Sequence, residues 1–80
     1  MRVVAEIPHP QFKITIFSWN EKYLIKLEAG PFEQTYKIAA LDLTSEDEVK
    51  AILNEEFLDS ATQIFLQMRK SFGKALSEFL

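Results

Sequence analysis

The sequence predicts a single α+β domain: a four-stranded antiparallel meander followed by two helices, with the long C-terminal helix packed across one sheet face. Two observations predict this fold. Apolar and polar residues alternate in phase through three predicted turns across residues 2–38, which is the pattern of a half-buried sheet. Beyond residue 43 the apolar residues follow steps of three and four, the spacing of one helix face. Eighty residues are enough for one domain, over residues 1–80, with a core just large enough to fold unaided.

Turn signals divide the first half of the chain into four strands. Pro8 and Pro10 end the first strand, because proline cannot continue a hydrogen-bonded ladder. Asn20-Glu21 fits a two-residue hairpin turn. Gly30 before Pro31 fits a tight turn with positive φ at its first central position. The strands are predicted over residues 2–7, 12–19, 22–29 and 32–39.

The predicted turns also specify the register of the sheet. Turns at 20–21 and 30–31 pair Ile25 with Ile16 on one side and with Tyr36 on the other. A four-residue loop at 8–11 pairs Ile7 with Phe12, and Ala5 with Ile14. A slip of one residue would turn a strand's apolar set to water, so the pattern defines one buried face. That face is predicted to carry Val3, Ala5, Ile7, Phe12, Ile14, Ile16, Tyr23, Ile25, Leu27, Tyr36 and Ile38.

The second half of the chain carries two helix-start signals. Thr44-Ser45 followed by three acids predicts a capping box and a first helix over about 45–55. Asp59-Ser60 with Gln63 predicts a second helix over about 60–79. The apolar stripe of the second helix consists of Ala61, Phe65, Met68, Phe72, Ala75 and Phe79. We expect this stripe to cover the sheet, and a coiled-coil contact between chains is the alternative use of the same residues.

The residue inventory argues against catalysis and metal binding. The chain has no cysteine and one histidine, His9, so thiolate chemistry, disulfides and a two-histidine metal site within one chain are excluded. The acids at 46–48 and 55–59 fit helix capping and solvation. No phosphate-binding glycine loop or HExxH motif is present. We therefore predict no enzymatic activity, no catalytic residues, no cofactor and no metal site.

Composition also bounds the location of the protein. No apolar run approaches the roughly 20 residues that span a bilayer, and the first residues lack the apolar core of a signal peptide. The absence of cysteine fits a reducing compartment. We expect a cytoplasmic protein without a membrane partner.

The face of the sheet opposite the predicted core holds the candidate site. Phe17, Trp19 and Leu24 fall together there, ringed by basic side chains. One interpretation is structural: Phe17 and Leu24 form a cross-strand pair while Trp19 packs on Lys22. A second is a protein–protein surface, most simply of a homodimer, aided by an exposed edge strand. A third is a stacking platform for single-stranded nucleic acid.

Charge decides between the binding interpretations. The net charge is −3, and Glu6, Glu28 and Glu33 share the candidate face, which disfavours a polyanion. We predict a non-enzymatic protein-interaction module that self-associates through the outer sheet face or an edge strand. The predicted contact residues are the anchors Phe17, Trp19 and Leu24 and the polar rim Arg2, Lys22 and Lys37. The alternative function is binding of single-stranded nucleic acid, another polyanion or a small ligand at the same face.

Overall fold

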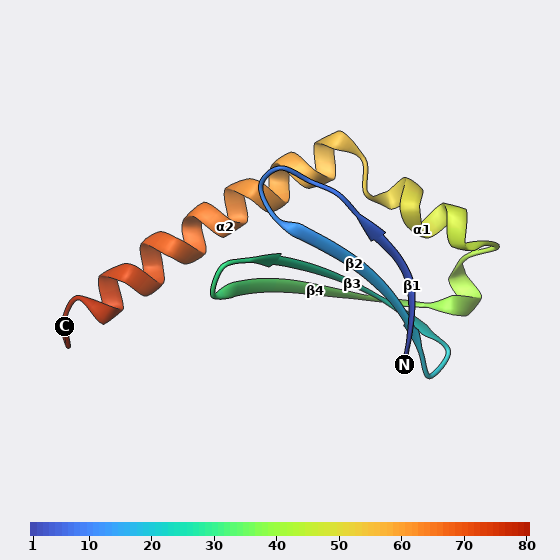
Figure 1. Ribbon diagram of the computed structural model, residues 1–80, viewed down its shortest axis with the longest axis horizontal. Helices are drawn as coiled ribbons and strands as arrows, with labels where there is room; N and C mark the ends of the chain where they lie inside the picture. Colours follow the sequence, from blue (N-terminus) through green and yellow to red (C-terminus); the bar gives the residue numbers. More distant parts are fainter.

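The computed structural model describes residues 1–80 and has the expected α+β arrangement, one four-stranded antiparallel sheet followed by two helices (Figure 1). The strands follow one another in the order β1-β2-β3-β4, so the sheet is the predicted meander. The elements are β1 (Arg2–Ile7), β2 (Lys13–Trp19), β3 (Lys22–Ala29), β4 (Phe32–Ala39), the short 3-10 helix η1 (Ala40–Asp42), α1 (Glu46–Ile52) and α2 (Glu55–Leu76).

The two tight hairpins have the predicted register. Ile16 pairs with Ile25 across β2 and β3, and Ile25 pairs with Tyr36 across β3 and β4. Asn20 and Glu21 both have positive φ, 54° and 63°, the mirror-image turn that matches the twist of a hairpin. Gly30 has φ 61° at the first central position of its turn, as its place before proline predicts.

The predicted register of β1 is wrong by two residues. Ile7 pairs with Ile14, not with Phe12, and Ala5 pairs with Ile16. The connection between β1 and β2 is therefore a five-residue loop over 8–12, one residue longer than predicted. Phe12 leaves the ladder and enters the core, where it is 7% exposed and its ring lies 5.4 Å from that of Phe65. Burial of this ring and the two prolines of the loop both work against a shorter hairpin.

A register shift at Val4 changes which side of the sheet the start of β1 faces. Val3 pairs with Phe17 and Ala5 with Ile16, which leaves Val4 as the extra residue of a β-bulge. Val3, predicted to be buried, is 53% exposed. Arg2 pairs with Ser18 and reaches the helix side, where its guanidinium lies 3.0 Å from the Glu46 carboxylate of α1.

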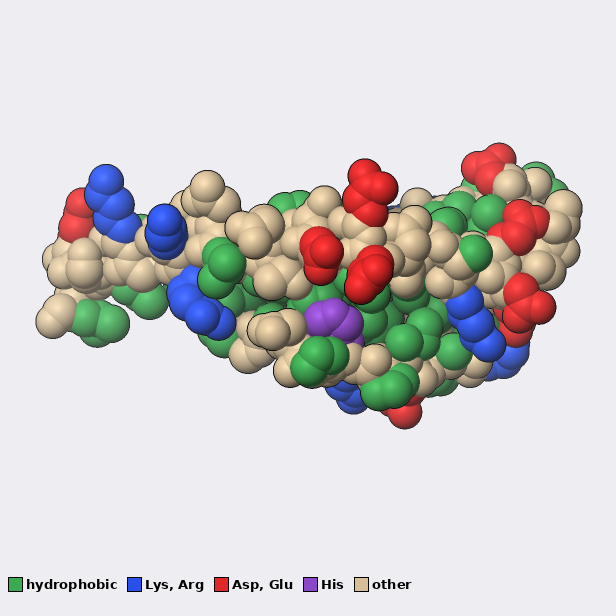
Figure 2. Space-filling model, turned by 90° about the horizontal axis from the view of Figure 1, so that it is seen from above, with side chains coloured by type: hydrophobic (Ala, Val, Ile, Leu, Met, Phe, Trp, Pro, Cys, Tyr) green, Lys and Arg blue, Asp and Glu red, His purple; other side chains and the backbone are tan.

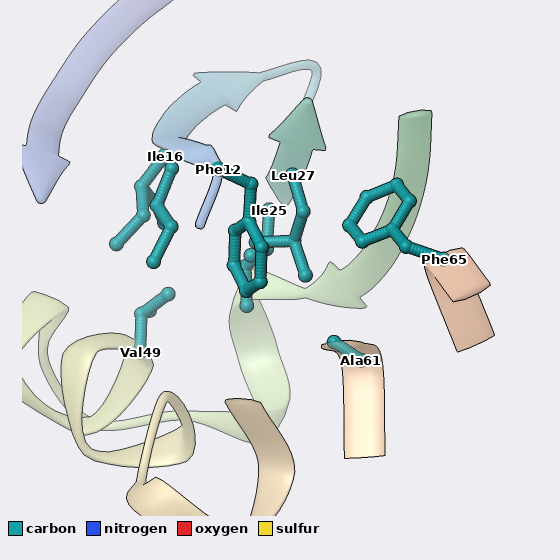
Figure 3. Packing of buried hydrophobic residues seen from close by; sticks show 8 residues of the cluster. Phe12, Ile16, Ile25, Leu27, Val49, Ala61 and Phe65 are labelled. Carbon is teal, nitrogen blue, oxygen red and sulfur yellow. The ribbon is translucent and has the colours of Figure 1, made fainter. Parts of the chain in front are cut away.

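The core lies between the sheet and the two helices (Figure 3). Its central layer is the set of apolar side chains that alternate along β2 and β3, and the helices close it with Val49 of α1 and Ala61 and Phe65 of α2. The eight buried members are Phe12, Ile14, Ile16, Ile25, Leu27, Val49, Ala61 and Phe65. Seven of them belong to the buried face or helical stripe that the sequence predicts, and the eighth, Val49, comes from α1.

The first helix begins at the expected place, after Thr44-Ser45, whereas the second begins earlier than expected. Ser45 precedes α1 but makes no side-chain cap bond, and the Glu48 carboxylate accepts hydrogen bonds from the amide and hydroxyl of Thr44 instead. The predicted start of the second helix at residue 60 is wrong, because α2 begins at Glu55. Asn54 caps it, its side-chain oxygen accepting the Phe57 amide at 2.8 Å.

One buried polar side chain joins the sheet to α2. The Gln34 side chain of β4 donates to the Ala61 carbonyl at 3.0 Å and accepts a bond of 2.5 Å from the Tyr36 hydroxyl. Gln34 is only 9% exposed, so its bond to the Ala61 carbonyl is shielded from water. This bond holds the first half of α2 over β4, and the bond from Tyr36 orients the Gln34 amide.

Candidate functional site

The C-terminal half of α2 extends past its own sheet. Figure 1 shows its last turns beyond the turn between β3 and β4. The molecule measures 47 × 26 × 19 Å and has a radius of gyration of 14.5 Å, whereas about 12 Å is typical of a compact chain of this length. Every residue from Arg69 onward is exposed. The helix therefore presents about two turns that no other part of the chain covers.

The apolar stripe of α2 continues into this projecting half. Phe65 is 6% exposed on the side of the helix that faces the sheet. Phe72, seven residues later, is 49% exposed, and Phe79, beyond the helix end, is 85% exposed. We call Phe72, Ala75, Leu76 and Phe79 the uncovered stripe. Phe72, Ala75 and Leu76 share one side of the helix with the buried Ala61 and Phe65, and Phe79 continues their spacing in the turn beyond the helix end. The stripe is thus the continuation of a core-facing surface into solvent.

A groove runs between the uncovered stripe and the β3–β4 turn. Its volume is about 510 Å³, and it is lined by Pro31, Phe32, Met68, Ser71, Phe72 and Ala75. The Phe32 and Phe72 rings, both lining the groove, meet edge to face with centroids 5.8 Å apart. The small side chains Ser71 and Ala75 leave its helical wall shallow. An apolar side chain from outside this chain would find apolar contacts on both walls.

Charged residues are segregated along α2. Acidic residues occupy the first turns, at Glu55, Glu56 and Asp59, whereas Arg69, Lys70 and Lys74 lie in the projecting half. Figure 2 shows acidic side chains over the middle of the helix layer and basic ones near the projecting end. This order complements the helix dipole. None of the three basic residues forms an ion pair within the chain.

The predicted contact residues of the outer sheet face are brought together only in part. Phe17 pairs with Leu24, Leu24 with Lys37, and Trp19 with Lys22, as the sequence predicts. Phe17 and Leu24 are half-buried and line a hollow of about 200 Å³ together with Met1, Lys26, Glu33 and Thr35. Trp19 is 50% exposed. Phe17 and Leu24 lie side by side, and Trp19 lies at the end of β2. Contacts within the chain already cover much of Phe17 and Leu24.

The rim of this face differs from the prediction. Arg2 turns to the helix side and pairs with Glu46, while Val3 takes the place beside Phe17. The Lys26 ammonium lies 3.6 Å from the Glu33 carboxylate, so its charge is partly neutralised. The bulge in β1 removes one cation from the outer face and adds one apolar side chain, which weakens its resemblance to a polyanion site.

The loop over 8–12 borders the largest hollow of the molecule, about 660 Å³. His9 stacks on Phe12, with ring centroids 4.1 Å apart, and its Nδ1 accepts the Gln11 amide at 3.1 Å. The nearby ions Glu6 and Lys13 pair with each other at 3.9 Å. The histidine thus packs and caps a turn. No serine or threonine is hydrogen-bonded to it, so the loop lacks the nucleophile–base pair that covalent catalysis needs.

The comparisons with family models, curated proteins and solved structures find no match. No cluster of three or more histidine, cysteine, aspartate or glutamate side chains has the geometry to hold a metal ion. Neither helix combines the length and the apolar character of a membrane span. The functional argument therefore rests on the surfaces of this chain alone.

Sequence reasoning gives contact between chains only as the alternative use of this stripe. The repeat of phenylalanine at 65, 72 and 79 shows where the stripe runs, but not which part of it covers the sheet. The signal that could have found it is length: 22 residues at about 1.5 Å each make a helix of about 33 Å, longer than its eight-residue neighbour β4, which extends about 27 Å.

Proposed function

We propose that this protein is a non-enzymatic interaction module that self-associates, and that the uncovered stripe of α2 is its main contact surface. The observation that supports this proposal is the continuity of the stripe. Its first half closes the core with Ala61 and Phe65, 1% and 6% exposed, whereas Phe72 and Phe79 are 49% and 85% exposed. The apolar pattern that covers the sheet continues beyond it, where Phe32 covers Phe72 only in part and Phe79 stays exposed.

The exposed area is large enough to matter energetically. A phenylalanine side chain buries about 200 Å², so the exposed fractions of Phe72 and Phe79 correspond to roughly 270 Å² of apolar surface. At ~25 cal/mol per Å² its burial contributes about 7 kcal/mol before any cost. Association costs at least ~4 kcal/mol and up to 15 or more. A surface that is itself apolar is therefore the best partner for the stripe.

The outer sheet face is the weaker candidate for the main contact. Phe17 and Leu24 pack on each other across β2 and β3 and are half-buried, so a partner gains less by covering them. Trp19 is 50% exposed and lies at one end of the row. This face stays a rival contact surface, which the same experiment tests.

Light scattering on the purified chain tests the proposal. We expect a mass of twice 9.3 kDa for the unaltered chain. Phe79→Gln removes the most exposed phenylalanine (85%) and should shift the mass towards that of one chain without loss of folding. Trp19→Ala is the matched control on the outer sheet face and should leave the dimer intact.

Three outcomes separate the ideas. A monomeric mass of the unaltered chain at every concentration overturns self-association. A dimer that resists Phe79→Gln and dissociates with Trp19→Ala moves the contact to the outer sheet face. Far-UV circular dichroism of each variant shows whether it is folded, and Phe72→Gln repeats the test at a second position of the uncovered stripe.

A further inference from the structure

We infer that the occupant of the uncovered stripe is the same stripe of a second copy, packed antiparallel about a two-fold axis at Ala75–Leu76. This inference rests on the proposed function and adds the partner's orientation and register to it. In this arrangement Phe72 of each copy lies against Phe79 of the other. The last turn of each α2 and the residues that follow it, over 77–80, then cover those of the other copy.

The position of the sheet selects the antiparallel orientation. The side of α2 that carries the uncovered stripe also carries Ala61 and Phe65, which rest on the sheet. A second helix laid parallel on the stripe would run its N-terminal half into the space that β4 fills. A second helix laid antiparallel runs its N-terminal half, and the sheet attached to it, away from the first sheet. Only the antiparallel pair avoids this overlap.

The residue sizes select the register. Ala75 is the small member of the stripe, between Phe72 and Phe79 at spacings of three and four residues. With the axis beside Ala75, the two helices approach to the lower end of the usual 8–10 Å range. The ring of Phe79 from the second copy then reaches the groove lined by Ser71, Phe72 and Ala75. The groove is thereby filled by the chain's own most exposed aromatic ring.

The charges agree with the same orientation. Arg69 and Lys70 lie at the inner end of the projecting half. In the antiparallel register the two copies of Arg69 are about 20 Å apart along the helix axis, well beyond the ~8 Å screening length of physiological salt. A parallel pair would place the two copies side by side. The charge of Arg69 therefore opposes the parallel pair and tolerates the antiparallel one.

The apolar area comes close to what a small dimer needs. Two copies contribute roughly 540 Å² from Phe72 and Phe79 alone. Apolar atoms make up about two thirds of a homodimer interface, so these rings imply roughly 800 Å² in total. Leu76, 37% exposed, and Leu80, 96% exposed, enlarge it. The pair approaches the ~1,000 Å² of a stable interface.

Single-cysteine variants test the geometry, because the chain contains no cysteine of its own. Ala75→Cys places a thiol beside the two-fold axis, within the short Cβ separation that a disulfide needs. We expect oxidised glutathione to convert most of this variant to a cross-linked dimer on a non-reducing gel. Ser71→Cys lies about 13 Å from its own copy in the antiparallel register and should stay uncross-linked. Lys70→Cys, on the opposite side of the helix, controls for random collision.

The outcomes separate the geometry from the proposed function. Cross-linking of Ala75→Cys, at least tenfold faster than Ser71→Cys and Lys70→Cys, supports the antiparallel pair. Equal cross-linking of Ala75→Cys and Ser71→Cys indicates a parallel pair and overturns the inference. A dimeric mass without cross-linking at Ala75→Cys overturns the geometry while self-association stands. A monomeric mass removes both.

Discussion

Gln34 is the one residue of the sheet whose side chain hydrogen-bonds α2. Its replacement therefore tests how much this bond contributes to holding α2 on the sheet. Gln34→Leu keeps a similar bulk at a position that is 9% exposed. It removes the 3.0 Å bond to the Ala61 carbonyl and the 2.5 Å bond from the Tyr36 hydroxyl. The Tyr36 hydroxyl then loses its only partner within the chain.

The expected magnitude follows from these two bonds. A neutral hydrogen bond contributes about 0.5–1.5 kcal/mol net, and a buried group without a partner costs about 1–3 kcal/mol. The Ala61 carbonyl lies inside a helix, where it already accepts a backbone amide, so the larger penalty falls on Tyr36. We expect Gln34→Leu to lower the free energy of unfolding by about 1–3 kcal/mol, and Tyr36→Phe by about 1 kcal/mol.

The double variant gives the decisive result. Once Tyr36→Phe removes the hydroxyl, Gln34→Leu leaves no tyrosine group without a partner. The combined loss should therefore be about 1 kcal/mol smaller than the two single losses added together. Additivity to within about 0.5 kcal/mol would refute the reasoning, because it would mean that the hydroxyl and the amide do not interact.

Urea unfolding followed by far-UV circular dichroism measures all four proteins of the cycle. Each is compared at one chain concentration, since self-association makes the midpoint depend on concentration. The slope of the transition should be unchanged, because no variant alters the surface exposed on unfolding by much. A thermal scan provides a second measure, with about 4–8 °C expected per kcal/mol for a chain of this size.

Two further predictions concern local structure. Glu21 has φ 63°, a conformation that glycine adopts more readily than glutamate. Glu21→Gly should therefore raise the free energy of unfolding by about 0.5–1 kcal/mol, and Asn20→Gly should raise it by less. A lower urea midpoint for Glu21→Gly would contradict this. Hydrogen bonds from the hydroxyl and then the amide of Thr44 lower the pKa of Glu48 below its usual 4.5, so its stabilisation is complete above about pH 4.5 and is lost as pH falls through the lowered value. Glu48→Gln should therefore be less stable than the unaltered chain at pH 7, with a gap that closes on acidification, and Asp47→Asn is the control that removes an equal charge but no recorded hydrogen bond; a gap independent of pH would contradict the assignment.

The outer sheet face shows how far sequence reasoning reaches for a candidate site. The pairs Phe17–Leu24 and Trp19–Lys22 follow from one tight turn, so their adjacency was predictable. The departure of Arg2 was not, because it depends on a bulge that inserts Val4 into β1. The alternation of residues 2–7 fits a regular strand and a bulged strand equally well. The local sequence pattern therefore does not distinguish the two.

Alternation and turn chemistry alone determined three of the four strands and their register. A two-residue turn at 20–21 or 30–31 allows one pairing, and a slip of one residue would expose a whole apolar set. The pairing of β1 required the tertiary structure. Phe12 lies close to Phe65 of α2, a contact between residues far apart in the sequence, and the loop adopts the length that lets this ring into the core.

The covering of α2 was decided by the tertiary structure alone. Phe65, Phe72 and Phe79 occupy equivalent positions of the same helical repeat, yet their exposed fractions rise from 6% to 49% to 85%. Periodicity defines which side of a helix is apolar, but it holds no information about where the sheet beneath that side stops. That limit depends on how α2 crosses the sheet, and it separates the residues that close the core from those that remain available to a second chain.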